Sequence, residues 1–539
     1  MHSPVLVGLV LVVLAVASLC DLTFKIILVL EVVYLAYFAL QLTPRLQRSL
    51  YEPPSISNPA RLLLWQRCLN SVPSVLEFTE SWFRFTADDD DDDDGDDDTR
   101  VRGGGGHHKS EGLGRAKVSY QEILRENVRE WVAWGLWGAE KPDDVPGKEL
   151  ELLVNELERA CREEVKEKEQ QQQQRRKSHK DKQQFAPQGG GGEGKNTEIS
   201  SLRFTYEPVK GLWKPFCLYI AMEMLWGIGA LVLVCLGFQY SSEGEVAYWV
   251  RRGQHQGTKE GGGGGGGGGG GYDSNNISTP HDPIILLHGI GLGVLPYVNT
   301  IWKLLKTEHW SRTLIAIESP EFPRLGISSL MSEPAIYAET VRRIMQKNGG
   351  YQKAIFMGHS IGSVYLTWII NNKPQLLRCC GISCTHGHLM GLVTERLVVR
   401  DPNVDFRLRR HFTWYQNVLW LSDIPHHVNT YIILSENDTF VPSQRVMEYI
   451  VDCQKRGEIC KQQRLENYDE NIREEDRNQQ QHKEDDEGIV GGNMVVASCP
   501  QQQTGSFATK LQAWCLEQEI EHLTDSSPKK NRTRRWGRL

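Results

Sequence analysis

The sequence predicts an α/β domain in its C-terminal part, built on a mostly parallel sheet with helices on both faces. Two observations predict it. From Pro280 onward, short apolar runs alternate with helical patterns, which is typical of a parallel sheet covered by helices. One of these runs continues directly into a Gly-x-Ser-x-Gly sequence and then into a helical pattern. We expect this domain to occupy residues 280–525.

Six apolar runs are expected to be its strands. They are Ile284–Leu287, Thr313–Ile317, Lys353–Met357, Cys379–Ser383, Asn429–Leu434 and Met494–Ser498. The helices expected between them include Glu333–Lys347, Ile361–Asn371 and Ser443–Lys455. Because ligands of open α/β sheets gather at the carboxyl ends of the strands, the residues just after these runs are the first candidates for a site.

Ser360 is the candidate nucleophile. It lies in Gly358-His359-Ser360-Ile361-Gly362, between a predicted strand and a predicted helix. A serine in such a turn is held in a strained conformation, and glycines two residues to either side let the helix and the neighbouring strands approach closely. A bare Gly-x-Ser-x-Gly match is a weak signal, and the strand–turn–helix setting makes it specific.

An earlier turn supplies candidates for an oxyanion hole. His288-Gly289-Ile290-Gly291 comes directly after the first predicted strand of the domain. We expect the backbone N–H groups of Ile290 and Ile361 to stabilise an oxyanion together. The His288 imidazole is interpreted as a structural part of the turn.

Asp438 is the candidate for the acid that orients a catalytic imidazole. It lies after the predicted strand Asn429–Leu434, and Glu436 in the same loop is the weaker alternative. Asp438 could instead be a turn acid or a cap of the helix that begins at Ser443.

The His-Gly turn, the GHSIG sequence and the D-x-x-V-P loop, in this order, resemble the α/β-hydrolase superfamily. The segment Arg410–Trp420 also resembles a segment of membrane-anchored, largely uncharacterised hydrolases of fungi and algae. The resemblance implies an α/β-hydrolase fold with a small cap, here residues 385–428, whose aromatic side chains either line an acyl pocket or pack the cap onto the domain.

The resemblance also implies a histidine after the last strand, and there the sequence departs from it. Thr504 occupies the expected place. We consider His482, in a polar insertion at 461–488, and His522, in the last helix, as alternatives. The other candidates come from the cap region: His386, His388 and His411. A further alternative is that no base is present and the domain is catalytically weakened.

The N-terminal part predicts membrane attachment. Residues 1–43 hold two apolar stretches, Pro4–Cys20 and Ile26–Leu42, of which the first is either a membrane segment or a signal peptide. Residues 216–238 are the best candidate for a transmembrane helix. Basic residues after the second stretch favour a cytosolic position for the chain that comes next, so that three spans would place the hydrolase domain on the lumenal side.

Two regions are expected to be linkers, because their composition cannot bury enough apolar surface to fold alone. Residues 44–215 contain an aspartate tract, glycine runs and a glutamine run, interrupted by an amphipathic helix at 120–137. Residues 239–279 are expected to be a glycine-rich linker. Residues 526–539 form a basic tail.

Composition excludes several classes of protein. A hydrophobic fraction of 40% rules out a multi-span transporter, and 15 Trp, 17 Tyr and 15 Phe rule out a wholly disordered or collagen-like chain. The 12 cysteines show no recurring metal-binding spacing, so we expect no metal. The glycine runs lack the features of a phosphate loop, and nothing predicts another cofactor or nucleic-acid binding.

The sequence therefore predicts a membrane-anchored serine hydrolase that cleaves an ester, with a lipophilic substrate, through an acyl-enzyme. The partners implied are a lipid or other ester substrate and a membrane. The alternative is a catalytically weakened module that binds a lipid or a protein partner at a membrane. Peptidase activity would use the same triad.

Overall fold

The chain forms two compact units. The computed structural model describes residues 22, 24–48, 53–86, 117–178, 194–253, 281–306, 312–318, 333–384, 395–411, 413–435, 438, 441–457, 463–466 and 494–499. Met1–Thr43, Gly211–Asp405 and Gln416–Leu539 belong to one unit, here called the sheet unit. Pro44–Lys210 and Phe406–Tyr415 belong to the other, the helical unit.

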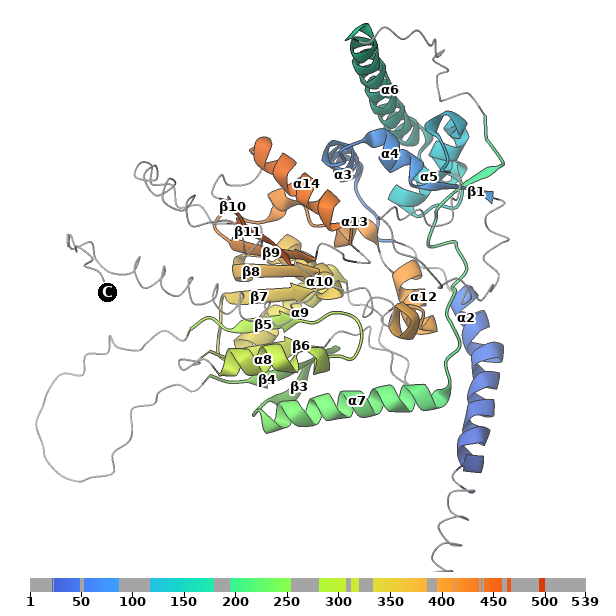
Figure 1. Ribbon diagram of the computed structural model, residues 1–539. Helices are drawn as coiled ribbons and strands as arrows, with labels where there is room; N and C mark the ends of the chain where they lie inside the picture. The colour runs from blue at the N-terminus through green and yellow to red at the C-terminus, as the bar shows by residue number, and fades with distance from the viewer. Residues whose placement is uncertain are drawn as a thin grey trace, which may run out of the picture. The chain divides into compact units, whose positions relative to one another are not determined.

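A nine-stranded sheet is the centre of the sheet unit, with the order β10-β11-β9-β8-β7-β5-β6-β4-β3 (Figure 1). The strand β4 is antiparallel to both of its neighbours, and all other neighbouring strands are parallel. The strands are β3 (Gln239–Glu243), β4 (Val246–Arg251), β5 (Ile284–Leu287), β6 (Leu314–Ile317), β7 (Ala354–His359), β8 (Leu377–Cys384), β9 (Asn429–Ser435), β10 (Gln463–Glu466) and β11 (Met494–Cys499).

All six strands expected from the apolar runs are present, as β5 to β9 and β11. The sheet nevertheless begins earlier than expected, because β3 and β4 lie in the region 239–279 that we expected to be a linker. The strand β10 likewise falls inside the expected polar insertion at 461–488. The strands β3 and β10 are polar, and β4 lies shortly before a glycine run. An interpretation based on composition therefore did not recognise them as strands.

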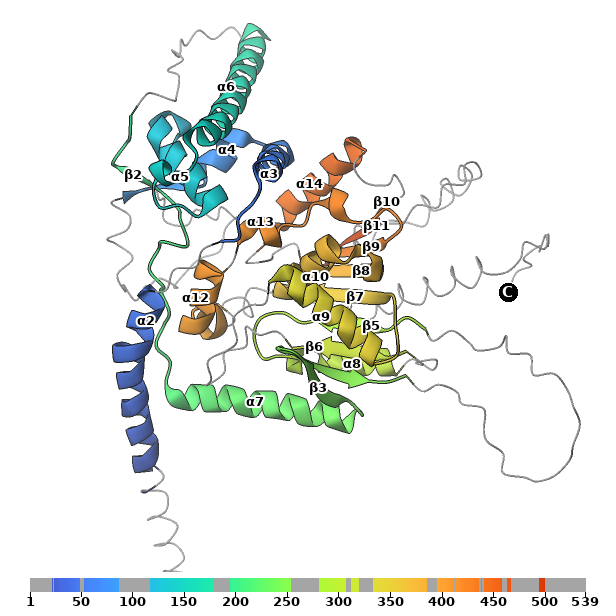
Figure 2. The same ribbon diagram turned by 180° about the vertical axis from the view of Figure 1, so that it is seen from behind.

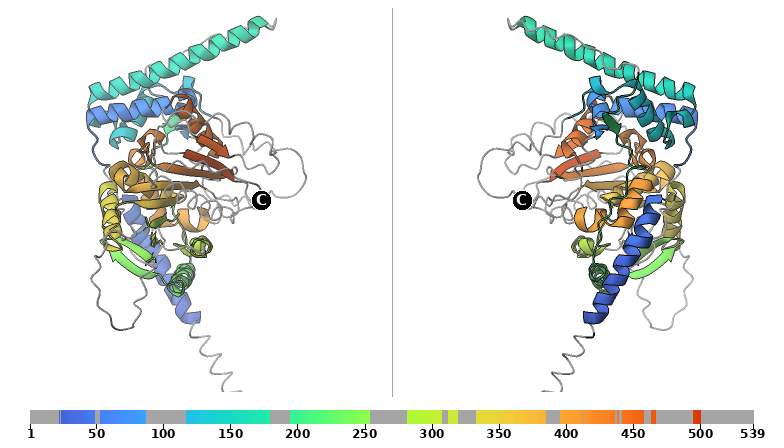
Figure 3. Two further views of the ribbon diagram at one scale, coloured as in Figure 1. Left: turned by 90° about the vertical axis from the view of Figure 1, so that its left-hand side faces the viewer. Right: turned by 90° about the vertical axis from the view of Figure 1, so that its right-hand side faces the viewer.

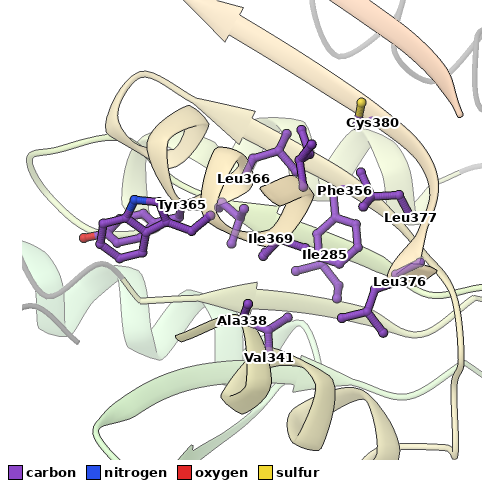
Figure 4. Close-up of a cluster of buried hydrophobic side chains, with 14 of the residues drawn as sticks. Ile285, Ala338, Val341, Phe356, Tyr365, Leu366, Ile369, Leu376, Leu377 and Cys380 are labelled. Carbon is purple, nitrogen blue, oxygen red and sulfur yellow. The ribbon is translucent and has the colours of Figure 1, made fainter. Parts of the chain in front are cut away.

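Helices cover both faces of the sheet, and alternate side chains of each strand serve the two faces. On one face, α7 (Phe216–Cys235) and α8 (Val298–Leu305) pack over a cluster that includes Ile284 and Leu286. On the other face lie α9 (Pro334–Lys347), α10 (Ile361–Asn372) and α14 (Ser443–Lys455) (Figure 2). Figure 4 shows part of this second cluster, with Ile285 and Phe356 between Leu366 and Ile369 of α10 and Ala338 and Val341 of α9.

Short helical segments complete the sheet unit and lead into the helical one. They are η1 (Phe38–Leu42), α2 (Thr43–Arg48), η5 (Leu295–Tyr297), η6 (Pro374–Leu376), η7 (Glu395–Val399), α12 (Pro402–Arg410), α13 (Trp414–Asn417) and η8 (Leu421–Asp423).

Two described helices are long and apolar enough to cross a membrane. One is Phe24–Arg48, which contains the expected stretch Ile26–Leu42, and the other is α7. The helix α7 ends at Cys235, three residues before the expected end, where Gly237 turns the chain with a φ of 84°. The first expected stretch, Pro4–Cys20, lies outside the described residues, as does the basic tail.

The helical unit has its own core, so residues 44–215 differ from the largely disordered linker that we expected. Its elements are α3 (Asn58–Ser71), α4 (Val75–Glu80), β1 (Phe83–Phe85), η3 (Tyr120–Glu122), α5 (Arg125–Trp137), η4 (Pro142–Asp144), α6 (Gly147–Ser178) and β2 (Ile199–Ser201). The helix expected at 120–137 is present as η3 and α5. Trp131 of α5 lies 5.8 Å, between ring centroids, from both Phe78 and Trp82.

Part of the expected cap belongs to the helical unit. The Trp414 indole donates a hydrogen bond to the Gly135 carbonyl at 2.6 Å, and the Tyr415 hydroxyl donates to the Pro54 carbonyl at 2.7 Å. These two aromatic side chains therefore form hydrogen bonds within the helical unit, which is the packing alternative that we gave for the cap.

Candidate active site

The turn at Ser360 has the geometry that a nucleophile elbow requires. Ser360 comes after the last residue of β7 and precedes the first residue of α10. Its φ of 55° and ψ of −124° make it the one residue other than glycine with a positive φ in the described part of the chain. Such a conformation is costly for a residue with a Cβ, and it persists only where the surrounding structure enforces it.

Two glycines allow this turn to form. A Cβ at Gly362 would overlap with the carbonyl oxygen of Leu287 at the end of β5, and a Cβ at Gly358 would lie 2.8 Å from the Gly362 carbonyl oxygen. Both are backbone atoms, which cannot rotate away. The Gly-x-Ser-x-Gly spacing is therefore explained by the close approach of α10 to β5 and β7.

The turn after β5 lies directly against Ser360. A Cβ at Gly289 would be 3.0 Å from Ser360 Cβ and 2.9 Å from His359 Nδ1. Ile290 is the next residue of this turn, and Ile361 is the first residue of α10. Among the described residues, neither of their N–H groups donates an intramolecular hydrogen bond. Two donors are thus left available beside the serine.

A tyrosine connects the two turns, and no sequence pattern pointed to it. The Gly289 N–H donates to the Tyr297 hydroxyl at 2.8 Å. That hydroxyl lies 2.6 Å from His359 Nδ1, so its own hydrogen is free to be donated there. Burial raises the pKa of Tyr297, which keeps it a neutral donor. The Gly289 N–H is therefore engaged, whereas the Ile290 N–H that we expect in the oxyanion hole donates to no other described residue.

His288 anchors the turn from behind, which agrees with its interpretation as a structural histidine. Its side chain is 1% exposed, with Nδ1 2.7 Å from the Gly289 carbonyl oxygen. Its Nε2 lies 3.3 Å from Glu318 Oε2, and the other oxygen of that carboxylate accepts the Trp249 indole N–H at 2.7 Å. Both ring nitrogens of His288 thus face acceptors within the fold.

Asp438 follows the carboxyl end of β9, just as Ser360 follows the carboxyl end of β7. Both residues therefore lie at the same end of the parallel strands. The strands β7, β8 and β9 are parallel, and their register aligns His359 with Ser383 and Ser383 with Ile433. One oxygen of the half-buried Asp438 accepts the Val441 N–H at 2.9 Å. This bond is a local turn contact of the kind expected for an acid in such a loop.

Of the five candidate bases, only His411 is among the described residues. His386, His388, His482, His522 and Thr504 lie outside them. His411 belongs to the helical unit, where its ring packs edge-on against Phe406, and burial together with nearby Arg407 lowers its pKa. Within the described residues, no group of three or more His, Cys, Asp or Glu side chains is placed to hold a metal ion.

The strand order, the single antiparallel reversal at β4 and the Ser360 turn define an α/β-hydrolase fold. Among solved structures, the chain is similar to a bacterial membrane phospholipase A, described as a virulence factor (11% identity, TM-score 0.32, 56% of this chain and 96% of that chain covered). It is also similar to naproxen esterase of Bacillus subtilis (12%, 0.31, 55% and 98%) and to a metagenomic α/β hydrolase from lagoon sediments in Morocco (14%, 0.31, 53% and 99%). No protein-family model and no curated protein matches the sequence.

Proposed function

We propose that this chain is a membrane-attached serine hydrolase that cleaves a lipophilic carboxylic ester through an acyl-enzyme. The observation that carries the proposal is the Ser360 turn. Its serine has a positive φ, it is flanked by Gly358 and Gly362, and the Gly289 turn lies against it. Packing of the fold does not by itself require a serine in a strained conformation at this place. A nucleophile elbow does require it, because the strained turn exposes the serine hydroxyl between the strand and the helix.

The proposed reaction begins with attack of Ser360 Oγ on the ester carbonyl carbon. The carbonyl oxygen becomes an oxyanion, which the N–H groups of Ile290 and Ile361 stabilise. Collapse of this intermediate breaks the ester bond, and the alcohol leaves with a proton. Water then attacks the acyl-enzyme, which releases the acid and restores the serine hydroxyl.

A histidine must take the serine proton and return it to the leaving alcohol, with Asp438 fixing its tautomer. His482, His522, His386, His388 and His411 are the candidates. Loss of a triad member leaves roughly 10³–10⁴-fold catalysis over water, so the base decides whether the site is an efficient enzyme.

The preference for a lipophilic ester rests on membrane attachment. The helix Phe24–Arg48 is long and apolar enough to cross a membrane, and almost none of its apolar stretch is buried within the protein. An apolar helix this exposed is stable where lipid surrounds it. A hydrolase held at a bilayer meets substrates that partition into it. The segment Arg410–Trp420 further leads us to propose kinship with membrane-anchored hydrolases of fungi and algae.

A fluorophosphonate probe tests the proposal, because it forms a covalent bond only with an activated serine. Purified full-length protein should be labelled, and Ser360→Ala should remove the label completely. Ser242→Ala, at an exposed serine on β3, is the matched control and should be labelled like the wild type. Substitution of the five candidate histidines by Gln, one at a time, should identify the base as the variant with the largest loss of labelling rate.

A second candidate is a non-enzymatic module that binds a lipid or a protein partner at a membrane. Thr504, where the family resemblance implies a histidine, favours it. Folded wild-type protein that remains unlabelled by the probe, beside a control hydrolase that is labelled, would support this module and contradict the enzyme.

A further inference from the structure

The helix α7 is attached to the sheet unit at its N-terminal end. Lys214 Nζ donates to the Leu397 carbonyl at 2.8 Å and lies 3.4 Å from an Asp401 carboxylate oxygen. The Tyr219 hydroxyl, in the first turn of α7, donates to that same carboxylate oxygen at 2.5 Å. The Lys214 and Asp401 side chains are 5% and 0% exposed. A buried ion pair of this kind is costly to separate, so this end of α7 stays with the segment around Asp401.

The middle of α7 packs against the chain just beyond the Gly289 turn. A Cβ at Gly229 would lie 3.0 Å from Leu295 Cβ, and a Cβ at Gly293 would lie 3.1 Å from the Trp226 ring. Both distances are shorter than ordinary contacts. The helix and this segment therefore touch at the level of their backbones.

The C-terminal end of α7 enters the core of the sheet. Leu233 and Phe238 are 1% and 3% exposed, and they belong to the cluster that contains Ile284 and Leu286 of β5. Only three residues separate α7 from β3. Figures 1 and 3 show α7 beside α8. A 20-residue helix, about 30 Å long, is thus attached to one folded unit at its start, middle and end.

The side of α7 that faces away from this unit is apolar and exposed. Exposed large apolar side chains recur on it at intervals of three or four residues, and we call them the outer stripe: Ile220 (41% exposed), Met224 (65%), Ile228 (53%), Leu231 (64%) and Val234 (56%). The stripe contains no charged residue. On the neighbouring α8, Trp302 is 44% exposed with Lys306 Nζ 4.8 Å from its ring centroid, a pairing suited to a membrane interface.

The outer stripe continues toward the other exposed apolar helix. Glu31 of the helix Phe24–Arg48 accepts the Phe216 and Cys217 N–H groups at 2.6 and 2.8 Å, and so caps the start of α7. The Tyr34 ring of that helix lies 5.6 Å from the Tyr219 ring. A helix that needs lipid around it is therefore joined to the end of the outer stripe.

From these contacts we propose that α7 lies in the plane of the membrane surface and does not cross it. A crossing helix must be surrounded by lipid or by other membrane-embedded chain, whereas the inner side of α7 is covered by the sheet unit from end to end. The lipid bilayer is the partner of the outer stripe, which would sink about 5–10 Å into the boundary between headgroups and acyl chains. This inference rests on the membrane attachment proposed above, and it replaces the span expected at residues 216–238.

The depth of the outer stripe in a bilayer tests the proposal. A fluorescent amino acid replaces Ile220, Met224 or Leu231, one at a time, in the full chain reconstituted into phosphatidylcholine–phosphatidylglycerol vesicles. Quenching by nitroxides at the headgroup and at two acyl positions gives the depth of each. The three positions extend over about 16 Å of helix. They should all report one shallow depth. The matched control is Ile336 of α9, which is 54% exposed on the opposite face of the sheet and should not be quenched.

Two results would overturn the proposal. A crossing helix would place Met224 roughly 5 Å deeper than Ile220 and Leu231. Absence of quenching at all three positions would mean that a protein surface or water meets the stripe. The measurement does not use activity. A uniform shallow depth in protein that the fluorophosphonate fails to label would therefore refute the hydrolase alone, and labelled protein with a crossing profile would refute only the in-plane helix.

Discussion

The sheet unit and the helical unit bury apolar cores by different means. In the sheet unit, β5 is a continuous apolar run whose alternate side chains enter two clusters, one on each face. In the helical unit, one indole ring holds the centre, since Trp131 lies within 6.0 Å, between ring centroids, of Trp65, Phe78, Trp82 and Phe83. A core spread over many strands can therefore be recognised in a local window, whereas one built around a few distant aromatics cannot.

The largest effect is expected from a substitution of Trp131, the residue at the centre of the core of the helical unit. Trp131→Ala should cost about 3–5 kcal/mol of stability, because a large, 5% exposed side chain is lost from a packed site. Hydrogen exchange should accelerate in α5 and α6 and remain unchanged in β5 and β7. Leu152→Ala, at a 51% exposed position on α6, is the control and should change little. Equal effects of the two variants would contradict the comparison.

The next effect concerns the glycines of each unit. Gly362→Ala should cost about 3 kcal/mol or prevent folding, because its Cβ would overlap with the Leu287 carbonyl oxygen. Gly135→Ala is the matched variant in α5 of the helical unit, where a Cβ meets nothing within 4 Å. It should be neutral or stabilise by up to about 1 kcal/mol. Denaturant unfolding of both proteins measures the contrast, and a tolerated Gly362→Ala would refute the close approach of α10 to β5.

A smaller effect is expected at the bond between the two turns of the candidate site. Tyr297→Phe removes the acceptor of the Gly289 N–H and the group that faces His359. If the Ser360 proposal holds, fluorophosphonate labelling should slow about tenfold, which corresponds to about 1.4 kcal/mol, while the protein stays folded. Tyr240→Phe, at a 48% exposed tyrosine on β3, should label at the wild-type rate. Unchanged labelling of Tyr297→Phe would show that the turn needs no such anchor.

The weakest effect is a pH dependence on the surface of the sheet unit. Hydrogen bonds from Arg342 and Lys373 lower the pKa of Glu339 from 4.5 to about 2. A lowered pKa contributes stability that is present above pH 4.5 and lost as the pH falls toward 2. The contribution is small because the Glu339 side chain is 35% exposed and water screens its ion pairs. The difference in unfolding free energy between wild type and Glu339→Gln should shrink over that pH range, and a constant difference would contradict the assignment.

Much of the sheet could be predicted because its central strands are buried on both faces and so appear as apolar runs. The strand β4 has the burial pattern of a central strand, yet it precedes a long glycine run and was assigned to a linker. The helical unit was missed for a related reason. Its Trp65 and Phe78 meet Trp131 only after folding, and the aspartate and glycine tracts between them dominate any average of composition.

In the candidate site, the turn at Ser360 could be predicted because its signal is local: a strand, a turn and a helix, with two glycines in five residues. The connection through Tyr297 could not, since its partners Gly289 and His359 are 8 and 62 residues away in the chain. The same limit applies to Trp414 and Tyr415, whose aromatic character suggested a pocket. Their polar atoms instead bond backbone carbonyls of residues some 280 and 360 positions earlier.

An in-plane α7 removes one crossing of the membrane and so reverses the compartment of the hydrolase domain. With three crossings the domain would face the lumen. With α7 on the surface, the proposal instead places the domain on the side of Arg45 and Arg48, which end the preceding apolar helix and favour the cytosolic side. The thiols of Cys379, Cys380 and Cys453 are buried and form no disulfide with another described residue, which suits a reducing compartment. If the proposed hydrolase activity also holds, its substrates would lie in the leaflet that faces the cytosol.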